Sequence, residues 1–171
     1  MAKSKKIPPQ LRRAYFDCRY GQLHVHNAIP AAGGFDELTA LVCIHAPGQT
    51  GRAFNATLAA LGSDRSIYAL DLPGCGETDP AEGEPWVDAG VNAIGDFLDS
   101  MRIRKVDLLA LGDGAAIARR LAAARPAQVR KLALLGEAPG TTVPALTQPL
   151  LPIATASATA ELAPQLAGFF D

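Results

Sequence analysis

Short apolar runs alternate along the chain with stretches in which apolar residues recur at helical spacing. The runs occupy residues 39–45, 66–70, 106–111 and 131–135. Continuous apolar runs of this length are typical of strands that are covered on both faces. The alternation predicts an α/β fold, a three-layer sandwich with a mostly parallel sheet and helices on both faces.

The segments between these runs have the apolar spacing of amphipathic helices. We expect one helix to bury Phe54, Leu58 and Leu61. A second helix has apolar residues four, three, four and three positions apart, at Val87, Val91, Ile94, Leu98 and Met101. The Ala-rich segment 115–125 predicts a third helix, which Pro126 ends.

Both ends of the chain differ from this alternating middle. Residues 14–18 and 22–27 predict a hairpin around 19–21, and the Gly-rich and Pro-rich stretch 28–37 predicts a loop. We therefore divide the chain into a flexible N-terminus (1–12), a core (13–139) and an apolar helical tail (140–171) that resembles a cap or lid.

The tail contains no Lys, Arg or His, and its best helix candidate is 155–166. Three interpretations stay open: a helical cover over the sheet edge, a mobile lid, or a segment that pairs with another molecule. The strand Lys131–Leu135 is expected to be an open edge. An apolar edge favours a homo-oligomer or a complementing chain as partner.

Composition excludes several classes of protein. A length of 171 residues with 49% hydrophobic and 19% charged residues fits one soluble domain. A net charge of −1 argues against nucleic acid as the main partner, and no apolar stretch is long enough for a membrane span. Three cysteines without paired spacing indicate a reduced compartment, so we expect a cytoplasmic protein with no cofactor and no metal.

Four motifs occur in order along the chain: His45-Ala-Pro-Gly-Gln-Thr-Gly51, Asp71-Leu-Pro-Gly-Cys-Gly-Glu-Thr-Asp79, a strand-turn-helix at 109–118, and residues 125–136. Together they resemble the α/β-hydrolase family over roughly residues 15–139. The resemblance implies the fold named above, here truncated after the sixth strand. It also implies that the His45-Ala46 loop supplies a main-chain N–H to an oxyanion hole, and that Gly74, Cys75 and Thr78 belong to a pocket wall.

The nucleophile elbow of the family reads Gly-x-Ser-x-Gly, whereas the matching segment here reads Ala110-Leu-Gly-Asp-Gly114. Gly112 takes the nucleophile position, and glycine has no side chain that can attack a carbonyl. Asp113 is the alternative nucleophile, since some family members use an aspartate, but it lies one residue late. Capping of the following helix is the competing role of Asp113.

The remaining catalytic groups of the resemblance are also incomplete, because no histidine follows His45. Glu137 follows the last predicted strand and is the candidate acid, with an exposed loop glutamate as the alternative. His24 and His26 share one face of a strand, and without a third ligand they are interpreted as ordinary strand residues. His45 ends a central strand and is the histidine expected to touch a ligand.

The sequence leaves three hypotheses. The first is a hydrolase-like pseudoenzyme without serine chemistry, which binds a small apolar or acyl ligand. The second is an active ester or lactone hydrolase that uses non-standard residues, or a fragment of a longer hydrolase. The third interprets Gly112-Asp-Gly114 as a dinucleotide-binding turn, which the absence of a third glycine disfavours.

Overall fold

The computed structural model describes residues 7–31, 38–137, 146–154 and 160–171. Within them the chain forms a seven-stranded sheet in the order β1-β2-β4-β3-β5-β6-β7. The strands are β1 (Gln10–Cys18), β2 (Gly21–Ile29), β3 (Ala40–Ile44), β4 (Ile67–Leu70), β5 (Val106–Leu111), β6 (Val129–Leu135) and β7 (Leu150–Ile153). β1, β2 and β4 pair antiparallel, whereas β4, β3, β5, β6 and β7 run parallel.

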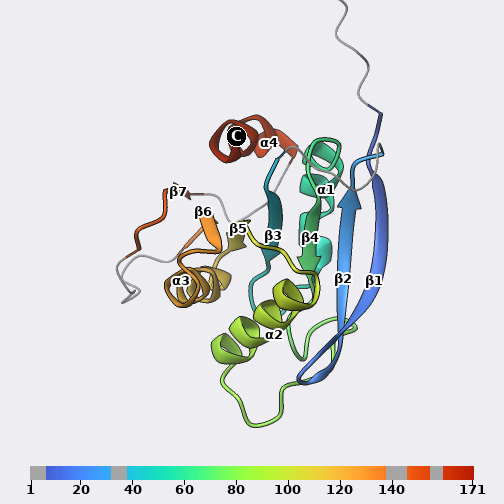
Figure 1. The fold of residues 1–171 in the computed structure, drawn as a ribbon, viewed down its shortest axis with the longest axis vertical. Coiled ribbons are helices and arrows are strands. Elements are labelled where there is room, and N and C mark those ends of the chain that lie inside the picture. Colours follow the sequence, from blue (N-terminus) through green and yellow to red (C-terminus); the bar gives the residue numbers. More distant parts are fainter. Residues whose placement is uncertain (1–6, 32–37, 138–145, 155–159) are drawn as a thin grey trace, which may run out of the picture.

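Helices cover both faces of this sheet, which confirms the predicted sandwich (Figure 1). α2 (Trp86–Ser100) and α3 (Gly114–Ala124) lie on one face, and α1 (Asn55–Leu61) and α4 (Ala163–Phe170) lie on the other. Each face has its own apolar core, and the side chains that alternate along β3 and β5 contribute to both cores. No helix among the described residues is long and apolar enough to cross a bilayer.

The predicted strands and helices lie close to the observed ones. The hairpin, the apolar strands and the end of α3 before Pro126 are confirmed. The core face of α2 differs from the prediction: Phe97 is buried on it, while Val87, Val91 and Met101 are only half-buried. Helical spacing identifies an apolar stripe but not which residues of the stripe or its edges are most buried, so it did not single out Phe97.

Two predicted boundaries are wrong. Residues 10–12 belong to β1 and not to a flexible terminus. β6 is not an open edge, because β7 pairs with it in parallel register from Leu132 opposite Leu150 to Leu135 opposite Ile153. Pro152 weakened the strand signal of β7, yet a proline that lacks an N–H is compatible with an edge strand. The prediction that another chain pairs with an open Lys131–Leu135 edge is therefore wrong, because β7 occupies that edge.

The tail packs at the end of the sheet where the parallel strands begin. Residues 138–145 and 155–159 lie outside the described residues, so the start of the tail and the start of the predicted helix 155–166 are not described. The observed helix α4 ends at Phe170. Arg130, at the start of β6, donates to the Phe170 carbonyl, and Arg65, just before β4, pairs with Asp171 at 2.6 Å. α4 is thus a cover over the sheet and not a lid over the opposite end.

Candidate active-site pocket

The turn between β5 and α3 is the centre of the candidate site. Gly112 has φ +49°, a left-handed conformation that favours glycine, and its N–H donates to the Leu135 carbonyl at 2.7 Å. A Cβ atom at Gly112 would lie 3.5 Å from the Ala46 Cβ, which is ordinary contact. The turn therefore has space for a side chain at this position but presents none.

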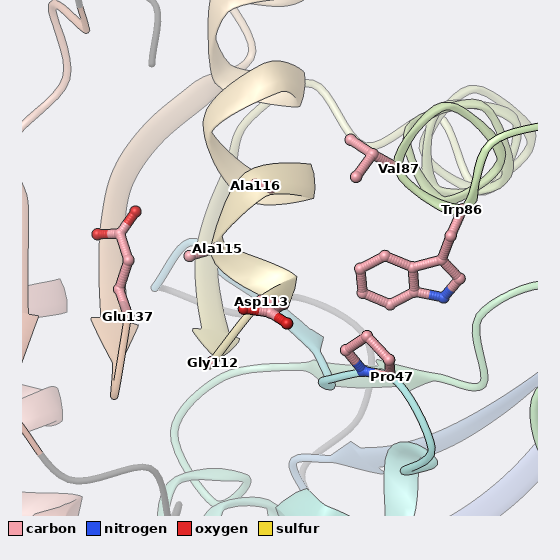
Figure 2. Close-up of a pocket in the computed structure, with 8 residues that line it drawn as sticks. All are labelled: Pro47, Trp86, Val87, Gly112, Asp113, Ala115, Ala116 and Glu137. Carbon is pink, nitrogen blue, oxygen red and sulfur yellow. The ribbon is translucent and has the colours of Figure 1, made fainter. Parts of the chain in front are cut away.

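A pocket of about 270 Å³ opens beside this turn (Figure 2). Its lining is mostly apolar and comes from the loop after β3, the start of α2, the start of α3 and the segment that follows β6. The lining residues are Pro47, Trp86, Val87, Gly112, Asp113, Ala115, Ala116 and Glu137. Crevices at the carboxyl ends of parallel strands are where α/β sheets bind ligands.

Asp113 precedes α3 and is exposed. Its side chain makes no hydrogen bond to the first turn of α3, so the expected capping bond is absent; the backbone at Asp113 is helical, whereas a capping residue is normally extended. Figure 2 shows its carboxylate directed toward Pro47, inside the pocket. This leaves an acidic group at an otherwise apolar site.

Glu137 lies on the other side of α3, where its carboxylate pairs with the guanidinium of Arg119. Its two carboxylate oxygens accept from Arg119 Nε and Nη2 at 2.6 and 2.7 Å. Its side chain is 18% exposed, which corrects the interpretation as an exposed loop glutamate. Because both carboxylate oxygens are occupied by the guanidinium of Arg119, Glu137 has to leave this pair before it can contact a ligand in the pocket.

The loop after β3 brings His45 close to the pocket but buries it completely. Its Nε2 accepts from the Leu72 N–H at 2.9 Å, so the proton is on Nδ1, which donates to the Ala46 carbonyl at 2.8 Å. Burial lowers the pKa of His45 and keeps the ring neutral. Because both nitrogens are engaged, the expectation that His45 touches a ligand is wrong for this geometry.

The expected oxyanion donor is also partly engaged. The Ala46 N–H donates to Gln49 Oε1 at 3.3 Å, a long hydrogen bond that a ligand oxygen can replace. The Ala46 Cβ faces the Gly112 turn, 3.5 Å from the place that a Cβ at Gly112 would take.

Gly74, Cys75 and Thr78 are not among the residues that line the pocket, which corrects their assignment to its wall. Thr78 is buried, and its Oγ1 accepts from the His24 N–H at 2.9 Å. The Cys75 thiol is half-buried, and burial raises its pKa, so it is protonated and weakly nucleophilic at pH 7. This loop has a structural role next to β2.

The sequence did not single out Trp86, Arg119 or the pairing of Asp71. Trp86 begins α2 and lines the pocket, and Arg119 pairs with Glu137. Asp71 contacts both His24 and His26, although 47 residues separate it from His24. The motif with Asp71 was visible in the sequence, but its pairing depends on the order of strands in the sheet.

A strand-turn-helix at the carboxyl end of a mostly parallel sheet with helices on both faces places this chain among the α/β sandwich proteins. This chain belongs to the alpha/beta hydrolase family, whose model matches residues 41–171. The search of curated proteins gave no significant match.

Solved structures agree with this assignment. Cfl2 from Burkholderia cenocepacia is 26% identical with a TM-score of 0.68, and the alignment covers 79% of this chain and 45% of that one. Haloalkane dehalogenase DbeA from Bradyrhizobium elkani is 18% identical (TM-score 0.66, 75% and 42% covered). Epoxide hydrolase VrEH1 from Vigna radiata is 21% identical (TM-score 0.64, 73% and 39% covered). The chain thus spans less than half the length of these structures.

Proposed function

We propose that the pocket beside Gly112 binds a small, mostly apolar or acyl ligand without covalent chemistry at the elbow. The observation that carries the proposal is the glycine itself. Gly112 has the left-handed backbone and the surrounding space of an elbow residue but no nucleophilic atom. The chain is in this proposal a pseudoenzyme of the family, or the part of a longer hydrolase that shapes the pocket.

The lining of the pocket supports a neutral ligand with an apolar body. Trp86, Val87 and Ala116 offer apolar surface, and Glu137 is already neutralised by Arg119. Asp113 would repel an anion and accept a hydrogen bond from a ligand donor. A ligand carbonyl can replace Gln49 Oε1 as the acceptor of the Ala46 N–H, which suits an ester or lactone.

The sequence contains one tryptophan, and it lines this pocket. We therefore expect ethyl butanoate, a neutral ester, to change the fluorescence of Trp86 in a saturable titration. Ala116→Leu fills the pocket and should weaken binding at least tenfold, because a leucine side chain occupies ligand space. The matched control is Ala123→Leu on the exposed side of α3, which should bind as the native chain does. Equal affinity in both variants contradicts the proposal.

One observation favours a second candidate, a hydrolase in which Asp113 acts. Its carboxylate is exposed inside the pocket, and no capping bond holds it. In that role Asp113 takes a proton from a water molecule as the water oxygen adds to the ester carbonyl carbon. The tetrahedral intermediate then breaks its bond to the alkoxide, which takes the proton back from Asp113 and leaves as the alcohol. Turnover of p-nitrophenyl butanoate that Asp113→Asn abolishes would favour this candidate over non-covalent binding alone.

A further inference from the structure

Three buried side chains that bind metals in proteins meet near β1, away from the pocket at Gly112. His24 and His26 come from β2, and Asp71 directly follows β4. His24 Nδ1 lies 2.9 Å from Asp71 Oδ2, and His26 Nε2 lies 3.5 Å from Asp71 Oδ1. One ligand atom from each residue lies within 4.8 Å of the others. The sequence showed the two histidines without a third ligand, and the fold supplies it.

We propose that His24, His26 and Asp71 form a binding site for a divalent transition-metal ion such as Zn²⁺. Zinc lies about 2.0–2.2 Å from imidazole nitrogens and carboxylate oxygens, so neighbouring ligands of a tetrahedral ion are about 3.4 Å apart. The separations of 2.9 and 3.5 Å lie close to this value. These two contacts use different oxygens of Asp71, and the three ligand atoms lie within 4.8 Å of one another, so the side chains have to move closer together to hold an ion.

The donor set determines the kind of metal. Two imidazoles and one carboxylate are borderline ligands that suit Zn²⁺ and similar ions, whereas Ca²⁺ and Mg²⁺ prefer oxygen. An ion between the two side chains would replace the hydrogen bond that joins His24 Nδ1 and Asp71 Oδ2, and these two atoms would become its ligands.

Backbone groups hold the carboxylate of Asp71 in position. The Gly51 N–H donates to Oδ1 at 2.7 Å, and the Glu77 N–H donates to Oδ2 at 3.2 Å. Such outer hydrogen bonds orient carboxylate ligands in metal sites. Gly51 has to be small, since a Cβ there would lie 2.7 Å from His26 Cδ2.

The histidines are reached from two surface cavities. His24 contributes to a cavity of about 540 Å³, together with Arg12, Arg13, Tyr15 and Glu77. His26 contributes to a second cavity of about 290 Å³. Water from these cavities can complete the coordination of the ion.

The surrounding charges oppose each other. The positive charges of Arg13 and Arg52 near His26 repel a metal cation, whereas the negative charge of Glu77 near His24 attracts one. Glu77 itself accepts a hydrogen bond from the Tyr15 hydroxyl. Arg12 also lines the cavity beside His24, so the three arginines outnumber the two acids, Glu77 and Asp71. We therefore expect the three ligands to provide the binding energy.

Nitrogen-15 NMR of the imidazole rings tests this site directly, because the full chain has only three histidines. During titration with Zn²⁺ we expect His24 Nδ1 and His26 Nε2 to shift, while His45 stays unchanged, since backbone groups hold both of its nitrogens. The proposal fails if none of the rings responds at millimolar Zn²⁺, or if His45 shifts as much as the other two.

A variant separates metal binding from the structural role of the cluster. His26→Gln removes one ligand but keeps the shorter contact between His24 and Asp71. At one hundred times the dissociation constant, Zn²⁺ should raise the melting temperature of the native chain by about 5–10 °C, and the same Zn²⁺ concentration should not raise that of His26→Gln. Cys75→Ser, which leaves the three ligands intact, should keep the rise. An equal rise in His26→Gln, or loss of the rise in Cys75→Ser, overturns the assignment.

Discussion

Gly114→Ala is expected to lower the melting temperature by about 5–10 °C, equivalent to about 2–3 kcal/mol of overpacking. Gly114 begins α3, and a Cβ there would lie 2.6 Å from the His45 carbonyl oxygen and 2.9 Å from that of Ile44. Both atoms are backbone at the end of β3, so α3 itself has to move. The loss should exceed the gain in helix propensity from alanine, about 1 kcal/mol. Thermal unfolding followed by circular dichroism measures it.

Gly112→Ala is the matched control two residues away. Its new Cβ makes only ordinary contact, at 3.5 Å from Ala46 Cβ, but its φ of +49° is unfavourable for alanine. We expect a cost of about 1–2 kcal/mol from the backbone alone. If Gly114→Ala loses no more stability than Gly112→Ala, the close approach of α3 to β3 does not determine the geometry of the elbow.

Asp107→Ala is the second substitution with a large expected effect, a loss of about 3–5 kcal/mol. Asp107 is fully buried in β5, where it accepts from Arg130 at 2.9 and 2.6 Å and lies 3.5 Å from Arg65. Arg65 is 2% exposed, and burial already lowers its pKa. Removal of Asp107 leaves this buried guanidinium with Asp171, its half-exposed partner. Denaturant unfolding measures the change in the free energy of unfolding.

The double variant Arg65→Met/Asp107→Leu tests the reason for that loss. If the cost comes from an uncompensated buried charge, apolar replacement of both partners should recover a large part of it. If the double variant instead loses as much stability as the two single variants together, the two side chains contribute independently. The ion pair between Arg65 and Asp107 would then be unimportant for stability.

The central part of the fold was predictable because its signals are local. The runs at 39–45 and 106–111 are apolar on both faces, and Pro126 ends α3 whatever the tertiary structure. β7 was not predictable, because four residues that include Pro152 carry little strand propensity and depend on β6 for their hydrogen bonds.

Only those parts of the site that are contiguous in the sequence were predictable. The segment 110–114 located the turn between β5 and α3 and the glycine within it, because these residues are contiguous in the chain. The partners of side chains were not predictable: Arg119 reaches Glu137 across 18 residues, and His45 is held by Leu72 across 27. Such contacts depend on strand order and on the depth of each side chain, and neither has a local signal.

The central claim is that the elbow of this chain does no covalent chemistry, and mass spectrometry of the labelled protein tests it most directly. The native chain is incubated with p-nitrophenyl butanoate and, separately, with 1,2-epoxyhexane, and the peptide 106–125 is then weighed. The segment contains no serine, and its glycine elbow has no nucleophilic atom, so we predict an unmodified mass with both reagents. A butanoyl or hydroxyhexyl group on Asp113 would contradict the account and make that residue a nucleophile.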